Sequence, residues 1–353
     1  MQSYSSAVQC SAVQCSAVQQ HNIITTVNTR LGETHKLTDA AAGYGFSLFL
    51  TANKDQPLWG CGVNSSGQLG YWRRRNPEGR EVGEPLEVLL EAGHIPLPLR
   101  EGEKVEALAA GRAHSLVLTS HGEVLSLGDN SHGQCGRAIV AEEDYSVRRP
   151  VHRMDTAGHR VTAVVAGQDH SLLVTSEGRV LACGWGADGQ TGQGHYRSSG
   201  ELGEVRGDLE GEVITKVACA GDCVLALSSS GEVFGWGNSE YGQFSLVTEE
   251  QQLCSPHHLP LALGSPCTDL ASGGTVCLAL TQEGRAWVWG YGVLGLGPRV
   301  DSLPQPQEIP PVLFGRSGAG AGAGAGGGCK AMCEQPVIAD CLCAGTFSLR
   351  TVG

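Results

Sequence analysis

Short apolar runs, separated by tight polar turns, follow one another through the middle of the chain. A clear example contains the three runs 161–166, 171–175 and 179–183. Gly178 suits a hairpin turn between the last two runs, because glycine adopts a positive φ without strain. No amphipathic segment of helix length interrupts the pattern. The pattern therefore predicts an all-β protein.

This block of runs occurs five times, and such a period is typical of repeat proteins. The copies begin at residues 43, 111, 167, 220 and 273. In each copy the third run is followed by one Gly and then by a second Gly five residues further on. These pairs are 62/67, 128/133, 184/189, 237/242 and 290/295. A small four-stranded sheet cannot bury both of its faces alone, so we expect the units to stack around a common axis as a β-propeller.

The composition supports a folded protein and narrows its class. Of the 353 residues, 51 are Gly and 41% are hydrophobic, which is too apolar for a disordered chain and too rich in glycine for a helical one. No apolar stretch reaches roughly 18 residues, so no integral membrane segment is expected. The formal net charge of −12 disfavours a broad nucleic-acid surface and suits protein partners.

The 14 cysteines are expected to be reduced thiols of an intracellular protein, because there is no secretory signal. Cys219 lies in an apolar run, where cysteine behaves as a small hydrophobe, and Cys223 is assigned to the loop that follows. The same applies to three further apolar-run cysteines: Cys61, Cys183 and Cys277. The spacing of the cysteines at 329–343 is poor for structural zinc, so we predict no metal and no cofactor.

The two ends of the chain differ from the repeats. Residues 6–19 read SAVQC-SAVQC-SAVQ, and residues 318–328 read GAGAGAGAGGG. Neither tract can build a packed core, because both lack large apolar side chains in a strand or helix pattern. We therefore predict propeller repeats over 37–315 and disorder over 1–36 and 316–353. A targeting signal in the first segment is not convincing, because its first Arg is Arg30 and no Arg-rich amphipathic helix is present.

The motifs G-x-x-H-S-L, G-x-V-x-x-W-G and G-x-x-G-Q-x-G resemble the regulator of chromosome condensation repeat. The resemblance implies a seven-bladed β-propeller, of which about five blades are recognisable here. The segments at 167–172, 183–196, 235–241, 288–298 and 309–315 resemble a mitochondrial, exchange-factor-like branch of that family. If neighbouring blades keep the angle of a seven-bladed ring, five blades form an open arc whose edge strands are unpaired. We therefore expect an incomplete gene product.

The resemblance also implies a function in which the protein makes and breaks no covalent bond. One implied role is guanine-nucleotide exchange on a small GTPase or on the dynamin-like fusion GTPase of the inner mitochondrial membrane, from its matrix side. The other is assembly of the mitochondrial large ribosomal subunit, together with proteins that handle 16S rRNA and its pseudouridylation. A purely structural interaction propeller and a non-functional fragment remain alternatives. In each case the chain is expected to be a regulator or scaffold and not an enzyme.

The turns that open the copies contain the candidate GTPase contacts. In the family, acidic and histidine residues of these turns line one face of the propeller. The matching positions here are Arg112, His114, Asp169, His170 and Asp222. Recurrence at one repeat position favours a packing role for the two histidines. The two aspartates are expected on an exposed loop, where a side chain packs against few neighbours. For them, contact with a partner and a structural role are equal alternatives.

A basic-aromatic cluster at 71–81 is the candidate contact for RNA or a protein partner. It contains Tyr71, Trp72 and four arginines, Arg73, Arg74, Arg75 and Arg80. Aromatic and guanidinium groups can stack on bases and pair with phosphates. The simpler interpretation is a solvated loop between two blades.

Two nucleotide-binding motifs can be set aside. Residues 184–189 and 290–295 match G-x-G-x-x-G, but a dinucleotide site requires a helix next, and the sequence after the first match is not helical. No G-x-x-x-x-G-K-[ST] motif is present, so the chain is not itself a P-loop GTPase. No catalytic Ser-His-Asp, Cys-His or paired-carboxylate arrangement stands out.

Overall fold

The computed structural model describes residues 36–147, 151–297 and 299–311. Within these ranges the chain folds into five four-stranded antiparallel sheets and one two-stranded ribbon. The all-β prediction and the propeller architecture are confirmed. The predictions for the two ends of the chain lie outside the described residues, apart from Lys36.

Each sheet is an up-and-down meander whose strands are neighbours in sequence, except where the ribbon interrupts the first sheet. The first sheet consists of β1 (Leu37–Ala42), β2 (Phe46–Thr51), β3 (Leu58–Val63) and β6 (Val88–His94). The second consists of β7 (Val105–Ala110), β8 (His114–Thr119), β9 (Val124–Gly128) and β10 (His152–Arg153). The third consists of β11 (Val161–Ala166), β12 (His170–Thr175), β13 (Val180–Gly184) and β14 (Ser199–Glu204).

A short 3-10 helix, η1 (Gly207–Leu209), connects the third sheet to the fourth. The fourth sheet consists of β15 (Ile214–Ala220), β16 (Cys223–Ser228), β17 (Val233–Asn238) and β18 (Gln252–Leu259). The fifth consists of β19 (Cys267–Ser272), β20 (Val276–Thr281), β21 (Ala286–Tyr291) and β22 (Ser302–Glu308). Cys223 therefore begins a buried strand, and its assignment to a loop was wrong.

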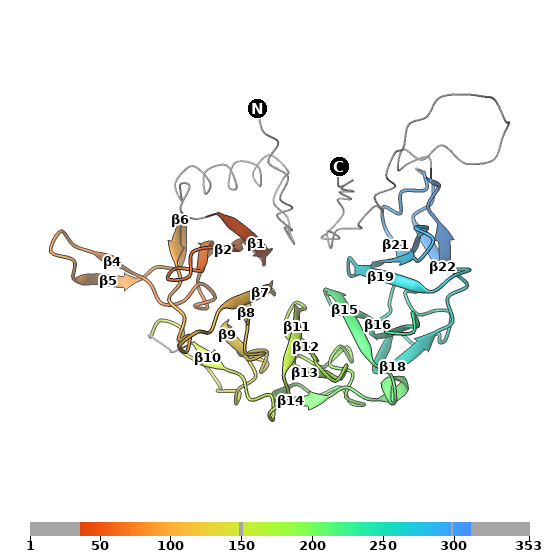
Figure 1. Cartoon of the computed structure of the whole chain (residues 1–353), viewed down its shortest axis with the longest axis horizontal. Coiled ribbons are helices and arrows are strands. Elements are labelled where there is room, and N and C mark those ends of the chain that lie inside the picture. The colour runs from red at the N-terminus through yellow and green to blue at the C-terminus, as the bar shows by residue number, and fades with distance from the viewer. Residues whose placement is uncertain (1–35, 148–150, 298, 312–353) are drawn as a thin grey trace, which may run out of the picture.

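The five sheets stand side by side in an open arc, with the first strand of each sheet on the inside (Figure 1). Each sheet contacts the next through these inner strands: β1 and β2 contact β7, β7 and β8 contact β11, β11 and β12 contact β15, and β15 and β16 contact β19. Packing only between sequence neighbours is what a radial repeat requires. The expected open arc is thus the arrangement of the described sheets.

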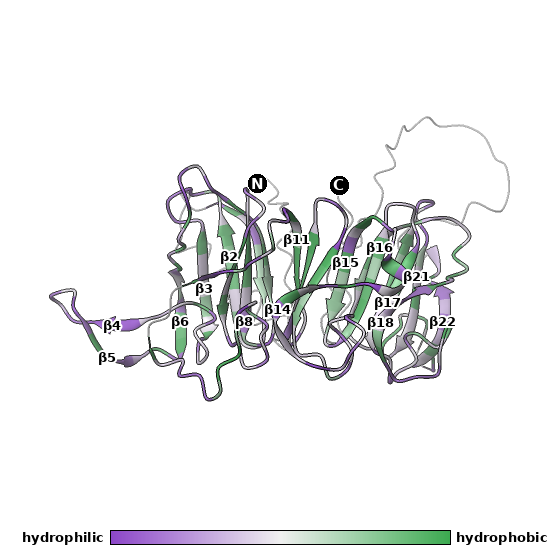
Figure 2. Ribbon diagram, turned by 90° about the horizontal axis from the view of Figure 1, so that it is seen from below, coloured by the Kyte–Doolittle hydropathy of each residue, from purple (hydrophilic) through white to green (hydrophobic). Residues whose placement is uncertain are grey.

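Apolar strand residues fill the spaces between neighbouring sheets, and polar loops close both ends (Figure 2). The largest cluster joins the third, fourth and fifth sheets around Trp236, Trp289 and Phe244, all fully buried. Trp236 and Trp289 stand where the first three copies have Cys61, Leu127 and Cys183. These indoles fill the space between neighbouring sheets, as the repeat pattern predicts.

Glycines set the turns and the close approaches. Gly178 has a φ of 75° in the turn between β12 and β13, as the hairpin prediction requires. Gly237 has a φ of 89°, and a Cβ built on it would overlap the carbonyl oxygen of Asp222 on the neighbouring strand. The glycine that follows the third run thus permits both a left-handed backbone and contact with the turn before β16.

The basic segment after the first copy does not form a solvated loop between blades, so that interpretation was wrong. It forms the ribbon of β4 (Arg73–Arg75) and β5 (Glu81–Pro85), inserted between β3 and β6 of the first sheet. The ribbon projects outward from the arc (Figure 1, Figure 2). In the ribbon, Arg74 pairs with Val82 and Arg75 with Glu81 in antiparallel register. The backbone groups of the two strands therefore bond to each other and not to the four-stranded sheets.

Candidate functional site

One end of the sheets gathers the loops that carry the predicted site. The turn before each second strand and the segment after each third strand meet there, because those strands are antiparallel neighbours. Backbone bonds join them: Trp185 N–H donates to Asp169 O at 2.7 Å, and Asn238 N–H donates to Asp222 O at 2.8 Å. We call this end the loop face. It comprises the turns 43–46, 111–114, 167–170, 220–223 and 273–276 and the segments 64–70, 129–136, 185–192, 238–245 and 292–297.

Arg112 and Asp169 form a bidentate ion pair between the second and third sheets. The Nε of Arg112 donates to Oδ1 of Asp169 at 3.0 Å, and its Nη2 lies 2.6 Å from Oδ2. The Asp169 side chain is nearly buried, whereas that of Arg112 is half exposed. Burial raises the pKa of Asp169, and the Arg112 charge opposes this. Asp169 therefore has its own cation, and only Arg112 presents a large exposed surface to a partner.

His114 and His170 occupy the interfaces between sheets and are fully buried. Nε2 of His114 lies 3.1 Å from Oγ of Ser171, and that hydroxyl donates to Gln134 O at 2.6 Å. Nε2 of His170 lies 3.3 Å from Sγ of Cys219. Burial lowers the pKa of both imidazoles to about 3, so both are neutral at physiological pH. The geometry gives each histidine a packing role, and a direct GTPase contact stays a prediction.

Asp222 has a different environment. Its Oδ1 accepts from Nε2 of Gln190 at 2.8 Å and lies 3.8 Å from Nδ1 of His170, beyond hydrogen-bond distance. Burial raises the pKa of its carboxyl group. Its side chain is 21% exposed, and no Lys or Arg of the described residues forms an ion pair with it. Asp222 is therefore the predicted acidic residue that is left for a partner.

Sequence reasoning missed two further acidic residues beside Asp222. Asp188 and Glu240 lie on the segments that follow β13 and β17, and Oδ1 of Asp188 accepts from Nε2 of Gln252 at 2.6 Å. Burial raises the pKa of Asp188, and the charges of Asp222 and Glu240 raise it further, so the three carboxylates repel one another electrostatically. Asp188 and Glu240 could have been found because they replace the Ser or His of other copies just before the Gly-Gln pair.

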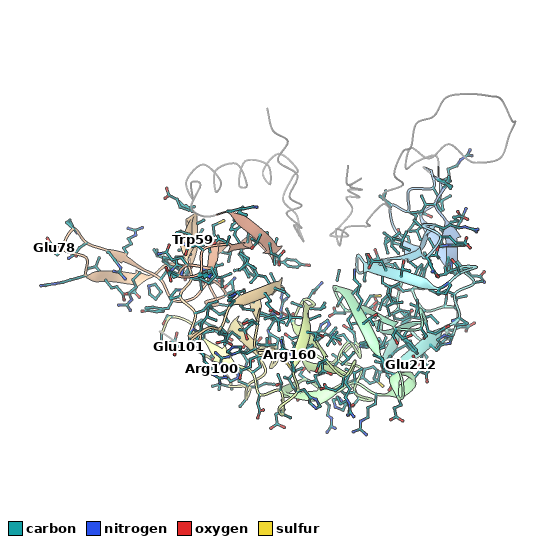
Figure 3. All side chains as sticks on the ribbon, viewed as in Figure 1. Trp59, Glu78, Arg100, Glu101, Arg160 and Glu212 are labelled. Atoms are coloured by element: carbon teal, nitrogen blue, oxygen red, sulfur yellow. The ribbon has the colours of Figure 1, made fainter. Side chains whose placement is uncertain are left out.

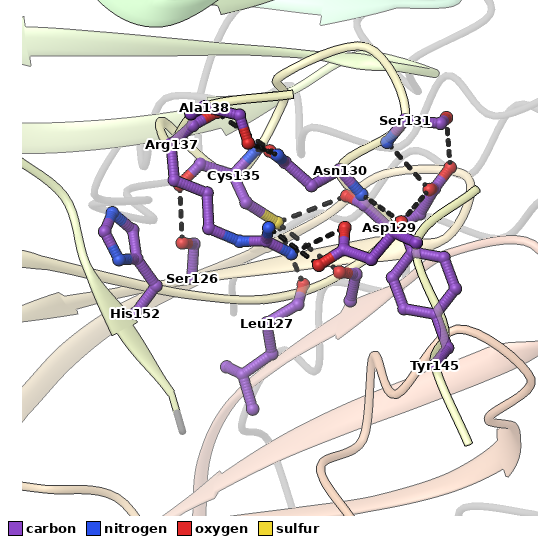
Figure 4. A network of polar contacts seen from close by, with 12 residues as sticks. Ser126, Leu127, Asp129, Asn130, Ser131, Cys135, Arg137, Ala138, Tyr145 and His152 are labelled. Atoms are coloured by element: carbon purple, nitrogen blue, oxygen red, sulfur yellow. Dashed lines mark hydrogen bonds and ion pairs between the residues drawn. The ribbon is translucent and has the colours of Figure 1, made fainter. Parts of the chain in front are cut away.

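A polar network on the second sheet was also missed (Figure 4). The Tyr145 hydroxyl donates to Oδ1 of Asp129 at 2.7 Å and accepts from the Asn130 N–H at 2.8 Å. The Asn130 side chain donates to Arg137 O and Ala138 O and accepts from the Cys135 N–H. Burial alone would raise the pKa of Asp129, but the bonds from Tyr145 and Ser131 together lower it. Every strong donor and acceptor here has a partner, so the network holds the loop and offers no free ligand.

The ribbon β4–β5 exposes Arg74, Arg75 and Arg80, whereas Arg73 is half-buried with its guanidinium 5.5 Å from the Tyr71 ring centre. Arg75 pairs weakly with Glu81 at 3.8 Å. Glu78, at the tip, extends away from the sheets (Figure 3). Four further glutamates follow in or next to the ribbon: Glu81, Glu84, Glu87 and Glu91. The basic cluster is thus offset by acidic side chains, which weakens its attraction for phosphates.

The described cysteines are all free thiols, and among the described ranges no group of three His, Cys, Asp or Glu side chains could hold a metal ion. Burial raises the pKa of Cys61 to about 11 and that of Cys135 to about 12, so neither is a reactive thiolate. The cysteines at 329–343 lie outside the described residues. No helix within the described ranges is long and apolar enough to cross a bilayer.

Five repeated four-stranded sheets, with buried G-x-x-H turns in two of them and Gly-Gln segments at the same end of four, define a β-propeller of the RCC1 type. The chain belongs to this family, because the family model "RCC1-like domain" matches residues 11–331. The RCC1-like G exchanging factor-like protein of Mus musculus is 48% identical over 295 residues, 83% of this chain and 63% of the mouse protein. The Homo sapiens protein of that name is 45% identical over the same shares.

The chain therefore spans 63% of the length of these two relatives. Among solved structures, human WBSCR16 is similar with a TM-score of 0.75 and 43% identity, covering 81% of this chain and 70% of the human one. Prp20p of Saccharomyces cerevisiae has a TM-score of 0.62 at 22% identity, covering 80% and 65%, and supports the fold alone. The chain is accordingly an RCC1-type propeller that is similar to proteins carrying the exchange-factor-like name.

Proposed function

We propose that the chain promotes guanine-nucleotide exchange on a GTPase that docks on the loop face. The mouse and human relatives carry the exchange-factor-like name, and this supports the choice of partner. The observation that carries the proposal is Asp222, a partly exposed carboxylate with no cation partner among the described residues. The nearby Arg112–Asp169 pair holds the adjoining turn in place.

The mechanism needs no covalent step. A GTPase holds the nucleotide phosphates through a P-loop lysine, backbone N–H groups and Mg²⁺. A carboxylate brought into that site competes with the phosphates for the lysine and for Mg²⁺. Asp222 is fixed by Gln190 on a rigid strand end, so little entropy is lost when it enters the site. The competition lowers nucleotide affinity and speeds release.

The partner we propose is the dynamin-like fusion GTPase of the inner mitochondrial membrane, approached from the matrix side. We propose this location because the chain resembles a mitochondrial branch of the family. A second candidate is a scaffold role in assembly of the large mitochondrial ribosomal subunit, near 16S rRNA and its pseudouridylation. The projecting ribbon, with three exposed arginines, favours this candidate.

Release of a fluorescent GDP analogue from the purified GTPase tests the exchange role. We expect Asp222→Asn to slow the stimulated release about tenfold, because a loss of roughly 1.4 kcal/mol of competition corresponds to that factor. Asp169→Asn should slow it less, since its carboxylate is already paired with Arg112. Glu210→Gln, on an exposed acid near η1 at the opposite end of the sheets, is the control. Equal release rates for Asp222→Asn and the unchanged chain would refute the exchange role.

A further inference from the structure

Aromatic pairs bridge neighbouring sheets at equivalent positions of the loop face. His132 packs against Trp185 between the second and third sheets, with ring centres 4.4 Å apart. Tyr241 stacks on Tyr291 between the fourth and fifth sheets, with ring centres 5.3 Å apart and planes 21° from parallel. In both pairs one ring directly precedes the second Gly of the repeat, and the other directly follows the Gly at the end of the third run. The first pair meets edge to face, with planes 63° apart, whereas the second is stacked, so the two boundaries share positions but not ring geometry.

The Tyr241–Tyr291 pair lies on the surface together with an exposed aliphatic residue. Each tyrosine is 44% exposed, and Val293 is 64% exposed. The fifth copy reads GYGVLGLG where the fourth reads GNSEYGQF, so the fifth copy has lost the polar side chains usual in this segment. Leu294 of this segment is buried in the core of the fifth sheet, whereas Val293 is exposed. We call Tyr241, Tyr291 and Val293 the tyrosine patch.

An exposed carboxylate, Glu240, adjoins the tyrosine patch, and two further carboxylates interact with each other electrostatically nearby on the loop face. Glu240 directly precedes Tyr241, and its charge helps raise the pKa of Asp188, as does the charge of Asp222. Among the described residues no Lys or Arg forms an ion pair with any of the three. The buried Nδ1 of His170 has no hydrogen-bond partner and lies 3.8 Å from Asp222. The charge of Arg112 opposes the rise in the pKa of Asp222, but the charges of Asp222 and Glu240 still raise the pKa of Asp188, and a partner's cation would relieve this repulsion.

We propose that the tyrosine patch docks a protein segment that presents arginine between apolar side chains. The guanidinium would stack on the tyrosine rings and pair with Glu240 and Asp188, while the apolar neighbours cover Val293. A nucleic acid fits poorly, because the same three carboxylates repel phosphates. Tyrosine is enriched at protein interfaces because it supplies large contact area at low entropic cost. This docking proposal extends the proposed function. It rests on that function only for the identity of the natural partner, the GTPase.

Fluorine NMR of 3-fluorotyrosine at position 241 tests the patch directly, with 3-fluorotyrosine at Tyr44 as the matched control. Tyr44 is 41% exposed on the same face but belongs to the first sheet. We expect a synthetic peptide with two leucines between two arginines to shift the signal at 241 and not that at 44. Glu240→Lys should weaken this binding at least about fivefold, since it reverses a charge beside the rings. Glu240 is exposed, so the change leaves the fold intact.

Three outcomes would overturn the proposal. The peptide could leave the signal at 241 unmoved, it could shift both tyrosines equally, or a ten-nucleotide uridine oligomer could produce the same shift. The last result would indicate a nucleic-acid surface instead.

The GTPase assay separates this proposal from the exchange role. Tyr291→Ala should raise the chain concentration needed for half-maximal nucleotide release about tenfold, with the maximal rate unchanged. Asp222→Asn should lower the maximal rate itself. If the unchanged chain gives no stimulation while the peptide still binds at 241, the exchange role fails and the docking patch stands. If Tyr291→Ala and the peptide both have no effect, the patch fails and the exchange role stands.

Discussion

At the residue scale, a buried backbone carbonyl between neighbouring sheets receives its hydrogen bond from one of two different side chains. The backbone carbonyl of the Gly-Gln segment points into the next sheet, where water is absent, so it needs a buried donor. In the earlier copies a serine supplies it: Ser115 donates to Gln68 O and Ser171 to Gln134 O. In the later copies an indole supplies it: Trp236 donates to Gln190 O and Trp289 to Gln243 O. The donor moves from the second strand to the third, and the accepted bond is conserved.

Because a serine and a tryptophan supply the same hydrogen bond in different copies, we expect removal of either donor to lower stability by a similar amount. Ser171→Ala and Trp236→Phe should each lower the free energy of unfolding by about 1–3 kcal/mol, because each removes the strong donor to a buried carbonyl. At Gln134 O only the weak Cys183 thiol donor, at 3.8 Å, remains. Urea denaturation followed by circular dichroism measures both. Ser176→Ala, in the exposed turn after β12, is the control and should change stability by less than about 0.5 kcal/mol. A loss at Ser171 no larger than that of the control would mean that the carbonyl finds another partner.

At the element scale, the sequence predicts strands well and insertions poorly. The strand predicted at 161–166 is β11 (Val161–Ala166), because both its turns contain glycine at fixed spacing. The strands of the ribbon β4–β5 are not predicted from the apolar pattern, because they are polar on both faces and contribute nothing to a core. Asp188 and Glu240 were missed for a related reason. Their proximity to Asp222 arises from packing between sheets, which no spacing along one copy reveals.

The ribbon supports a prediction of its own. If the chain contacts rRNA, replacing Arg74 and Arg75 by Gln should reduce co-purification of 16S rRNA about threefold to tenfold and flatten its salt dependence, since each lost phosphate contact lowers the slope by roughly one. Arg299→Gln, at an exposed arginine beside the fifth sheet, is the matched control. Unchanged rRNA recovery would leave the ribbon without an RNA role.

At the scale of the whole molecule, the arc holds together through contacts between sheets, and two of these contacts contain neutral histidines. Burial holds the pKa of His114 and of His170 at about 3, whereas an unfolded chain has a histidine pKa near about 6.5. Between these values the unfolded state binds more protons, so stability falls as the pH falls. The raised pKa values of Asp169 and Asp222 act in the opposite direction, because each carboxyl group takes up a proton at a higher pH in the folded chain than in the unfolded chain.

We therefore expect stability to be nearly constant above pH 7 and to fall between pH 6 and pH 5, with His114 and His170 each contributing up to roughly 1.4 kcal/mol per pH unit. Burial also lowers the pKa of His152, which adds to the fall. Urea midpoints at half-unit pH steps measure the slope. His170→Gln keeps a polar side chain but cannot take up a proton, so the slope should fall by up to about 1.4 kcal/mol per pH unit, even if the variant is less stable at pH 7. His121, on an exposed turn of the second sheet, provides the control His121→Gln, whose slope should match the unchanged chain. A slope unaffected by His170→Gln would show that acid acts elsewhere than at the contacts between sheets.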